Sequence, residues 1–467
     1  MTQSTPERFD VLIIGVGQAG KPLAQAFAEK GRSVALIERK FVGGTCINYG
    51  CTPTKTLLAS AQMAYQARRS GEYGVRIGKV TVDFRAISKR KNEVVTMFRE
   101  GIEAKLAETD HLTLLYGEAK FAGPKDVLVT GVDGQTRITA DLIFINAGTQ
   151  PKKPDMPGLD TVKWLTSTTL MDIESPPEHL LIVGGGYIGV EFGQMFSRFG
   201  SKVTILVREG QLLPREDPDM AEELAKVLTD EGIKIKYNSD IELVSESRSG
   251  GVTLKVKTNR KSTQISGSHL LVAVGITPNT EALNLSAAGV ETDENGFIIV
   301  NDRLETNQPG IYALGDIKGG PAFTHIAYDD YRIVKQNLLD KGNASIVGRM
   351  VPYTVFTDPQ LGRIGLSEHE ARKQGKVVKV AKMPMSWVGR AIETGHTNGF
   401  MKVLIDADSD QILGAAIFGA EGGELMSMLQ IAMMGQLPYQ KLRDAVFAHP
   451  TLAESLNNLF ANLDKNE

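Results

Sequence analysis

The chain contains only two cysteines, Cys46 and Cys51, and they lie five positions apart. Two thiols this close together cannot cross-link a chain of 467 residues, whereas reducing compartments keep disulfides mainly where they are catalytic or redox-sensing. A zinc site needs about four ligands, and no third cysteine exists to help. The pair therefore indicates redox chemistry and no metal site, with two functionless buried thiols as the alternative.

Glycines and a proline surround this cysteine pair. Gly43, Gly44 and Gly50 allow the backbone to approach a flat cofactor closely. Pro53, followed by residues that permit a helix, predicts a helix that begins near Cys51. A thiol at a helix start has a lowered pKa, and the thiolate is the reactive form of cysteine.

A glycine motif upstream of the cysteines predicts a dinucleotide site. An apolar run, residues 11–14, precedes Gly15-Val16-Gly17-Gln18-Ala19-Gly20, and a helical stretch through Lys30 and a strand over Val34–Ile37 follow. In such a unit the glycines make a tight turn, approach a pyrophosphate and pack the helix on the strand, with the phosphates at the helix N-terminus. Glu38 can accept hydrogen bonds from a free ribose diol.

A second copy of this unit lies in the middle of the chain. Its strand, residues 180–183, precedes Gly184-Gly185-Gly186-Tyr187-Ile188-Gly189, a helix to about Phe199 and a strand over Val203–Val207. Gly15 and Glu38 are 23 positions apart, and so are Gly184 and Val207. One such motif alone is a weak signal, but two in matching contexts predict two dinucleotide sites.

The second site is expected to bind a different dinucleotide. Val207 stands where the first copy has its acid, and Arg208 follows it. An apolar residue cannot chelate a ribose diol, whereas a guanidinium can hold a 2′-phosphate, so this site favours NADP(H). Arg215 could assist and Glu209 argues against; the alternative is that Arg208 is a solvated surface charge.

Composition and charge argue against several other classes of protein. Hydrophobic residues make up 42% of the chain and charged residues 23%, as in a globular protein. The net charge of -3 means that the chain has no excess positive charge of the kind that binds nucleic acid. The chain begins with a polar stretch, residues 1–10, and contains no run of 18 apolar residues. We expect a soluble cytoplasmic protein that does not span a membrane.

The chain is long enough for three or four domains. Pro-rich stretches over residues 151–157 and 174–178 indicate a domain break at about residue 150. A later strand ends in Gly315-Asp316, where a doubly wound sheet presents groups to its ligand; an ordinary strand exit is the alternative. Strands at Phe400–Ile405 and Ile412–Phe418, followed by helices from Leu425, predict a separate C-terminal domain.

The segment Gly43-Gly44-Thr45-Cys46-Ile47-Asn48-Tyr49-Gly50-Cys51-Thr52-Pro53-Thr54-Lys55, placed after the first dinucleotide unit, resembles the class I FAD-dependent pyridine nucleotide-disulfide oxidoreductases. That family includes dihydrolipoamide dehydrogenase, glutathione reductase, mercuric reductase and hypothiocyanous acid reductase, and the resemblance covers essentially the whole chain. It implies an α/β fold with two Rossmann-like dinucleotide-binding domains and an α+β C-terminal dimerisation domain. The implied domains are 1–150 and 277–347 for FAD, 151–276 for NAD(P)H and 348–467 for dimerisation.

The resemblance assigns cofactor contacts residue by residue. Those to FAD map to Gly15, Gly17, Gly20, Glu38, Gly44, Thr45, Lys55, Gly117, Ala119, Ala147, Gly148, Asp316 and Ala327, with the aspartate holding the ribityl chain. Those to the nicotinamide nucleotide map to Gly184, Gly186, Tyr187, Gly189, Val207, Arg208 and Gly275. The implied cofactors are FAD and NADPH in preference to NADH.

The same resemblance assigns the catalytic roles. Cys51 becomes the thiolate that faces the flavin, and Cys46 the interchange thiol that attacks the substrate. Lys55 lies near flavin N5 and pairs with Glu191, and Tyr187 covers the flavin until nicotinamide displaces it.

Near the C-terminus, His449 and Glu454 match the family's acid–base pair. Imidazole titrates near neutral pH and suits thiol–disulfide exchange, and a carboxylate can fix its tautomer. A lone histidine is more often structural, but of the seven in this chain only this one lies in a His-Pro-Thr segment with a glutamate five positions on. In the family the pair reaches the disulfide of the other subunit, which implies an obligate homodimer.

Departures from the family pattern narrow the range of candidate substrates. Mercuric reductases end in a vicinal cysteine pair and replace the histidine, and this chain does neither, although residues 213–218 look like mercuric reductase. Dihydrolipoamide dehydrogenases carry a second histidine where Phe447 stands and an acid where Val207 stands. Residues 54–57 and 454–459 look most like the hypothiocyanous acid reductase branch.

The leading hypothesis is an NADPH-dependent reductase of a small disulfide or a reactive oxidant such as hypothiocyanous acid, with a role in cell redox homeostasis. Electrons would pass from NADPH through FAD to the cysteine pair, with the histidine of the second subunit handling protons. The alternatives are an NAD-dependent dihydrolipoamide dehydrogenase, a mercuric-reductase-like metal ion reductase, and a flavin redox sensor that does not turn over.

Overall fold

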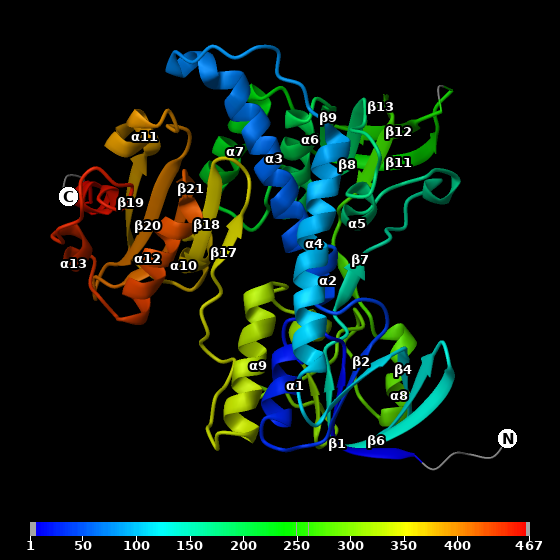
Figure 1. Ribbon diagram of the computed structural model, residues 1–467. Coiled ribbons are helices and arrows are strands. Elements are labelled where there is room, and N and C mark those ends of the chain that lie inside the picture. Colours follow the sequence, from blue (N-terminus) through cyan, green and yellow to red (C-terminus); the bar gives the residue numbers. More distant parts are fainter. Residues whose placement is uncertain (1–5, 249, 260, 464–467) are drawn as a thin grey trace. The chain divides into compact units, whose positions relative to one another are not determined.

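The computed structural model describes residues 6–248, 250–259 and 261–463, and the chain divides into two compact units (Figure 1). The first unit comprises Met1–Leu57, Arg85–Lys153 and Gly275–Arg349. The second comprises Leu58–Phe84, Pro154–Val274 and Met350–Glu467. Two long helices, α3 (Cys51–Arg69) and α4 (Phe84–Ala107), have residues in both units.

A seven-stranded sheet forms the centre of the first unit. Its parallel part has the order β3-β2-β1-β6-β16, with bounds Leu112–Tyr116, Val34–Glu38, Glu7–Ile14, Gly134–Ile145 and Ile311–Ala313. An antiparallel meander, β4 (Glu118–Gly123) and β5 (Asp126–Gly131), continues from β6. The apolar run 11–14 is wholly buried, as expected of a central parallel strand that is covered on both faces.

Helices and a small sheet complete the first unit. The helices α1 (Gly20–Ala28) and α9 (Thr324–Leu338) pack side by side (Figure 1). The cysteines lie in α2 (Gly44–Asn48) and at the start of α3. The short elements are β7 (Thr149–Pro151) paired with β15 (Ile276–Pro278), η3 (Glu281–Leu283), α8 (Leu285–Ala288) and η4 (Gly315–Lys318).

The second unit contains the second parallel sheet, of order β10-β9-β8-β14. These strands are Lys234–Lys236, Lys202–Leu206, His179–Val183 and His269–Val272. The helix after β8 is α6 (Tyr187–Arg198), and α7 (Pro218–Asp230) follows β9. An antiparallel sheet joins β11 (Ser239–Glu246), β12 (Val252–Thr258) and β13 (Lys261–Gly267), and the short elements are η1 (Ser70–Tyr73), η2 (Leu159–Thr161) and α5 (Ser167–Leu170).

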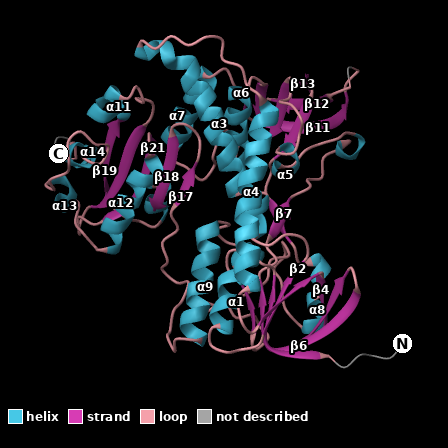
Figure 2. Ribbon diagram, viewed as in Figure 1, coloured by secondary structure: helices cyan, strands magenta, loops and turns pink. Residues whose placement is uncertain are grey.

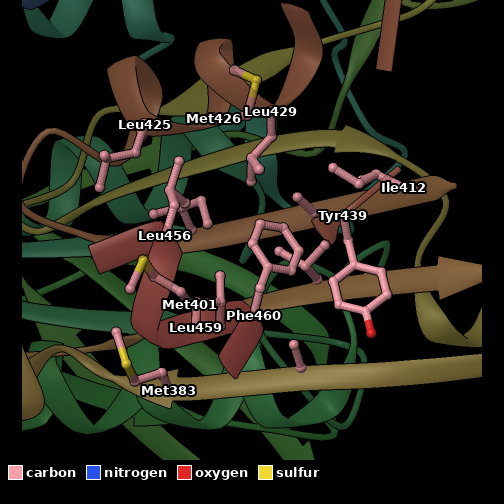
Figure 3. Packing of buried hydrophobic residues seen from close by; sticks show 14 of the residues in the cluster. Met383, Met401, Ile412, Leu425, Met426, Leu429, Tyr439, Leu456, Leu459 and Phe460 are labelled. Atoms are coloured by element: carbon pink, nitrogen blue, oxygen red, sulfur yellow. The ribbon is translucent and has the colours of Figure 1, made fainter. Parts of the chain in front are cut away.

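The C-terminal part of the second unit is a five-stranded antiparallel sheet with helices (Figure 2). Its order is β17-β18-β21-β20-β19, with bounds Tyr353–Val355, Gln360–Gly365, Ile412–Gly419, Phe400–Asp406 and Val378–Pro384. The helices are α10 (Glu368–Lys373), η5 (Met385–Trp387), α11 (Gly389–Glu393), α12 (Gly422–Met434), α13 (Gln440–Arg443) and α14 (Ser455–Ala461). Side chains of α12 and α14, such as Leu425 and Phe460, pack with Met401 of the sheet in one apolar core (Figure 3).

The sequence patterns predict part of this arrangement. Both strand–turn–helix–strand units, the strands near 400 and 412 and the following helix form as expected, with ends that differ by at most four residues. The meander β4–β5, the sheet β11–β13 and the long helix α4 are not anticipated from the motifs. Among the described residues, no helix is long and apolar enough to cross a membrane. The three boundaries between the four predicted domain segments stay a prediction.

Candidate active site

The two glycine loops have the same geometry, as their matching spacing predicts. A Cβ at Gly15 would lie 2.4 Å from the carbonyl oxygen of Asn146, and one at Gly184 would lie 2.3 Å from that of Ala273. A Cβ at Gly20 would lie 2.1 Å from the carbonyl oxygen of Gly15, and the corresponding distance in the second loop, from Gly189 to Gly184, is 2.0 Å. Only glycine fits these positions, so each loop packs tightly between its strand and its helix.

Asn146 fixes the first glycine loop and was missed by sequence reasoning. It is buried at the end of β6, its Oδ1 accepts the N–H of Gly20 at 2.9 Å, and its Nδ2 donates to the carbonyl oxygen of Leu314 at 2.8 Å. The loop, β6 and β16 are therefore joined by one side chain. Glu38, at the end of β2, accepts the N–H of Val16 in the same loop at 3.1 Å.

The turn that carries Asp316 is held by a buried charge cluster. Asp330, which is fully buried, accepts the N–H of Gly315 at 2.8 Å and lies 2.6 Å from Nη1 of Arg349 and 3.3 Å from Nζ of Lys318. Burial raises the pKa of Asp316 above its usual value. The turn therefore presents a partly desolvated carboxyl group at a strand end, as predicted.

The cysteine-bearing helix α2 packs directly on the first glycine loop. A Cβ at Gly44 would lie 2.8 Å from Cα of Gly17, and the N–H of Gly43 donates to the carbonyl oxygen of Val16 at 2.9 Å. Both cysteines are free thiols, and Cys51 is the first residue of α3, where the helix was predicted to begin. The thiol pair and the predicted pyrophosphate loop thus belong to one local structure.

The second glycine loop has an apolar floor. Val207, just beyond β9, is fully buried, and a Cβ at Gly185 would lie 2.9 Å from its Cγ2. The Val207 side chain therefore offers nothing to a ribose diol. Arg208 is 78% exposed and lies 3.4 Å from Glu209.

The His449–Glu454 pair forms as predicted. Nδ1 of His449 lies 2.9 Å from Oε2 and 3.0 Å from Oε1 of Glu454. Thr451 holds the turn between them, since its Oγ1 accepts the N–H of Glu454 at 3.3 Å and donates to the carbonyl oxygen of Ala448 at 2.7 Å. The histidine is 79% exposed, so Nε2 can reach a group on another molecule while the carboxylate orients the ring.

Comparison with known families agrees with this geometry. Residues 9–330 match the family described as pyridine nucleotide-disulphide oxidoreductase, and residues 351–460 match the dimerisation domain of the same family. The chain belongs to the pyridine nucleotide-disulphide oxidoreductases. This result confirms the predicted family, the α/β fold class and the prediction of an FAD-dependent oxidoreductase that uses NAD(P)H and acts on sulfur.

Individual relatives extend over nearly the whole oxidoreductase chain. The probable pyridine nucleotide-disulfide oxidoreductase RclA of Escherichia coli is 39% identical over 97% of this chain and 99% of its own. A mercuric reductase of Lysinibacillus sphaericus is 34% identical (98% and 83%), and a dihydrolipoyl dehydrogenase of Thermus scotoductus is 34% identical (96% of each). A solved Cu(II) complex of the HOCl-induced flavoprotein disulfide reductase RclA from Escherichia coli has a TM-score of 0.90 at 38% identity (98% and 99%).

The first unit of this oxidoreductase fits FAD. At the ends of β1, β2 and β16 it brings together the glycine loop, the Glu38 carboxylate, the Asp316 carboxyl group and the two thiols. A carboxylate accepts about four hydrogen bonds, so Glu38 keeps acceptor capacity for a diol. Dinucleotide phosphates require backbone N–H groups at a helix start, and α1 supplies them. Asp316 lies in the turn after β16, and its predicted contact with the ribityl chain stays a prediction.

The two thiols of the oxidoreductase differ strongly in acidity. A hydrogen bond from the Cys46 thiol lowers the pKa of Cys51 to about 6, aided by Thr324, whose Oγ1 lies 3.2 Å from Sγ of Cys51, and by the charge of Lys55. The same hydrogen bond and burial raise the pKa of Cys46. The direction agrees with the prediction for Cys51, but hydrogen bonding is the main cause rather than the helix start.

Removing the Thr324 hydroxyl tests this origin of the thiolate. The Cys51 thiolate predominates above about pH 6 and is lost as the pH falls through that value. Since a hydrogen bond to a charged group stabilises it, Thr324→Val is expected to raise this pKa by roughly one. The pKa is measured from the ultraviolet absorbance of the thiolate in the reduced enzyme as the pH is varied. Thr113→Val, at an exposed position of β3, is the control. An unchanged midpoint in Thr324→Val would show that Thr324 does not stabilise the thiolate.

The remaining predicted residues take their places in the same two units. In the first, Thr45 lies in α2, Gly117 precedes β4, Ala119 lies in β4, Ala147 and Gly148 follow β6, Ala327 lies in α9 and Gly275 precedes β15. In the second, Gly186 and Tyr187 begin α6, and buried Glu191 accepts the N–H of Phe356 at 2.9 Å. The pairing of Lys55 with Glu191 and the individual contacts with FAD and nicotinamide stay predictions.

Proposed function

We propose that this oxidoreductase uses NADPH to reduce a small disulfide or a thiol-reactive oxidant such as hypothiocyanous acid. The polarised thiol pair carries the proposal, because a thiolate at Cys51 beside a protonated Cys46 is the arrangement that a dithiol reductant needs. The likeness to an HOCl-induced flavoprotein disulfide reductase from Escherichia coli supports it. So does the absence of any cysteine after Cys51, since no further thiols are present to hold a metal ion substrate.

The residues around the cofactor hold and orient it. The first glycine loop and Glu38, which already share a hydrogen bond, would hold the adenosine diphosphate half of FAD, and Asp316 would hold its ribityl chain. When bound, FAD would supply two-electron transfer between a nicotinamide and the cysteine disulfide. Lys55 contributes positive charge near the Cys51 sulfur, which favours the thiolate that this reduction leaves.

Reduction of hypothiocyanous acid by the two thiols balances in two steps. Cys46 gives its proton to His449 of the second subunit and attacks the sulfur of the oxidant. Hydroxide leaves that sulfur, takes the proton back from the histidine and becomes water. The Cys51 thiolate then attacks the Cys46 sulfur, thiocyanate leaves, and the disulfide closes. The oxidant gains the two electrons that the thiol pair loses.

The family forms homodimers through its dimerisation domain, and we propose that the active site is shared between subunits. Exposed apolar side chains in the C-terminal part of the chain support a second copy of the chain as the partner. In α12, Ile431 and Met434 are 68% and 66% exposed, and Val446, three residues before His449, is fully exposed. A dimer formed through this part of the chain would cover such side chains. A cytoplasmic location fits a dithiol that must stay reducible.

A substrate panel tests the proposed function. Purified holoenzyme is assayed for NADPH and NADH consumption with hypothiocyanous acid, a small disulfide and Hg(II), and for NAD⁺ reduction with dihydrolipoamide. The proposal predicts the highest kcat/KM for NADPH with a sulfur oxidant. Preference for NAD⁺ and dihydrolipoamide would establish the second candidate, dihydrolipoamide dehydrogenase, which the His449–Glu454 geometry also favours. If the enzyme turns over with none of these substrates, the remaining alternative is a flavin redox sensor.

Preference for NADPH is expected to depend on Arg208. Replacing it with glutamine removes a charge-assisted hydrogen bond to the 2′-phosphate, so KM for NADPH should rise about tenfold while KM for NADH stays unchanged. Lys226→Gln, which neutralises an exposed cation of α7, is the control. Equal changes for both nucleotides would mean that Arg208 is only a solvated surface charge, the alternative noted from the sequence.

A further inference from the structure

Tyr187 lies between the second glycine loop and the C-terminal sheet. It is the first residue of α6, directly after Gly186, so its ring borders the position where a nicotinamide dinucleotide binds. Its ring centroid lies 5.4 Å from that of Tyr353, the first residue of β17, with an interplanar angle of 39°. A strand of the dimerisation domain therefore contacts a wall of the nicotinamide site.

The hydroxyl groups of the two tyrosines form an ordered chain that ends on Glu216. The Tyr353 hydroxyl donates to Oε1 of Glu216 and also shares a hydrogen bond with the Tyr187 hydroxyl. Burial raises the pKa of both tyrosines, which keeps both hydroxyls protonated donors near neutral pH.

Glu216 is fixed to the same glycine loop. Its side chain is fully buried and lies 3.5 Å from Nη1 of Arg363. Its N–H donates to the carbonyl oxygen of Leu213 at 2.8 Å, and the N–H of Leu213 donates to that of Gly185 at 2.9 Å. The acceptor at the end of the chain is therefore anchored to the loop that binds the dinucleotide.

A second contact holds β17 and the residue that follows it against α6. Glu191, one turn along the helix from Tyr187, accepts the N–H of Phe356, which lies three residues after Tyr353. With the strand and the helix fixed at this point, Tyr187 can leave its position only by rotating its side chain away from Tyr353. That rotation breaks the hydrogen bond between the two hydroxyls.

We propose that Tyr353 and Glu216 are positioning residues that hold Tyr187 in this place and thereby weaken nicotinamide binding until the Tyr187 ring is displaced. The inference rests on the proposed location of Tyr187 at the nicotinamide site, and it is independent of which oxidant the enzyme reduces. Tyr353 lies outside every motif that the family resemblance supplies, and Glu216 lies in a segment to which it assigned no role.

The test is anaerobic stopped-flow reduction of the holoenzyme flavin by NADPH, without any oxidant. Tyr353→Phe keeps the ring and removes the hydroxyl, so the Kd for NADPH is expected to fall about 2- to 10-fold, the factor that one net hydrogen bond supplies, while the limiting rate is unchanged. Tyr187→Phe removes the same hydrogen bond from its other end and should give the same fall. Adding Tyr353→Phe to Tyr187→Phe should then change nothing further.

Tyr73→Phe is the matched control. Its hydroxyl donates to the carbonyl oxygen of Thr394 at 2.7 Å in the same unit, and loss of this hydrogen bond should leave the Kd for NADPH unchanged. An unchanged or raised Kd for NADPH in Tyr353→Phe overturns the proposal. So does a Tyr353→Phe substitution that lowers the Kd equally in the wild type and in Tyr187→Phe. If Tyr353→Phe does not fold, an unchanged or raised Kd for NADPH in Tyr187→Phe is sufficient to overturn the proposal. Failure of the proposed function can be distinguished from failure of this inference. It would abolish turnover with the oxidant while flavin reduction by NADPH persists.

Discussion

Replacing Cys51 with serine is expected to abolish turnover by at least about 10³-fold, the scale for loss of an essential nucleophile. Serine cannot form a disulfide with Cys46 and does not ionise near neutral pH, whereas the Cys51 thiol has a pKa of about 6. The variant should also lack the long-wavelength absorbance that a thiolate beside flavin gives on NADPH addition. Steady-state rates and stopped-flow spectra measure the two effects.

Cys46→Ser is the matched control for the role of Cys51. It should abolish turnover to the same extent, because the attacking sulfur is lost, yet keep the long-wavelength band, because the Cys51 sulfur remains. The serine hydroxyl can replace the hydrogen bond that lowers the Cys51 pKa. If the band persists in Cys51→Ser and disappears in Cys46→Ser, the roles of the two sulfurs are reversed.

His449→Ala is expected to lower kcat with a sulfur oxidant by about 10²- to 10⁴-fold, the range for a general acid–base group. The reason is that the raised pKa of Cys46 keeps it protonated, so it needs a base before it can attack. Flavin reduction by NADPH should remain unchanged, since that step involves no proton transfer by the histidine. Glu454→Gln should give a smaller loss in kcat, because the ring nitrogen keeps a hydrogen-bond partner without the charge.

Two controls make the histidine prediction sharp. His369→Gln changes another exposed histidine, in α10, and should leave kcat unaltered. Mixing inactive Cys51→Ser and His449→Ala homodimers and allowing subunit exchange should restore turnover, because a hybrid dimer regains one site with both groups intact. Full activity of His449→Ala, or no recovery in the mixture, would contradict a site shared between subunits.

Much of the site is predictable from local pattern because its chemistry depends on short spacings. The glycines, Glu38 and the cysteines lie within one strand–helix–strand unit and the turn after it, so their mutual positions follow from strand and helix geometry. The repeat at Gly184 is recognisable for the same reason, and its loop reproduces the close contacts of the first.

The residues that sequence reasoning missed act across long separations. Asn146 bonds to Gly20 across 126 positions, and Thr324 bonds to Cys51 across 273. Tyr353 meets Glu216 across 137 positions, and the segment around Glu216 was noted only for its likeness to mercuric reductase. No local spacing relates such residues, because they become neighbours only when β-strands from distant parts of the chain join one unit.

Anaerobic reductive titration of the flavin tests the central claim, that the Cys46–Cys51 pair is the redox partner of FAD, most directly. Oxidised wild-type holoenzyme is titrated with NADPH, and the hydride equivalents taken up per flavin are counted from the absorbance. The disulfide predicts one equivalent beyond that needed to reduce the flavin, and both Cys46→Ser and Cys51→Ser should lack it. Equal uptake by wild type and both variants would contradict the proposed electron path.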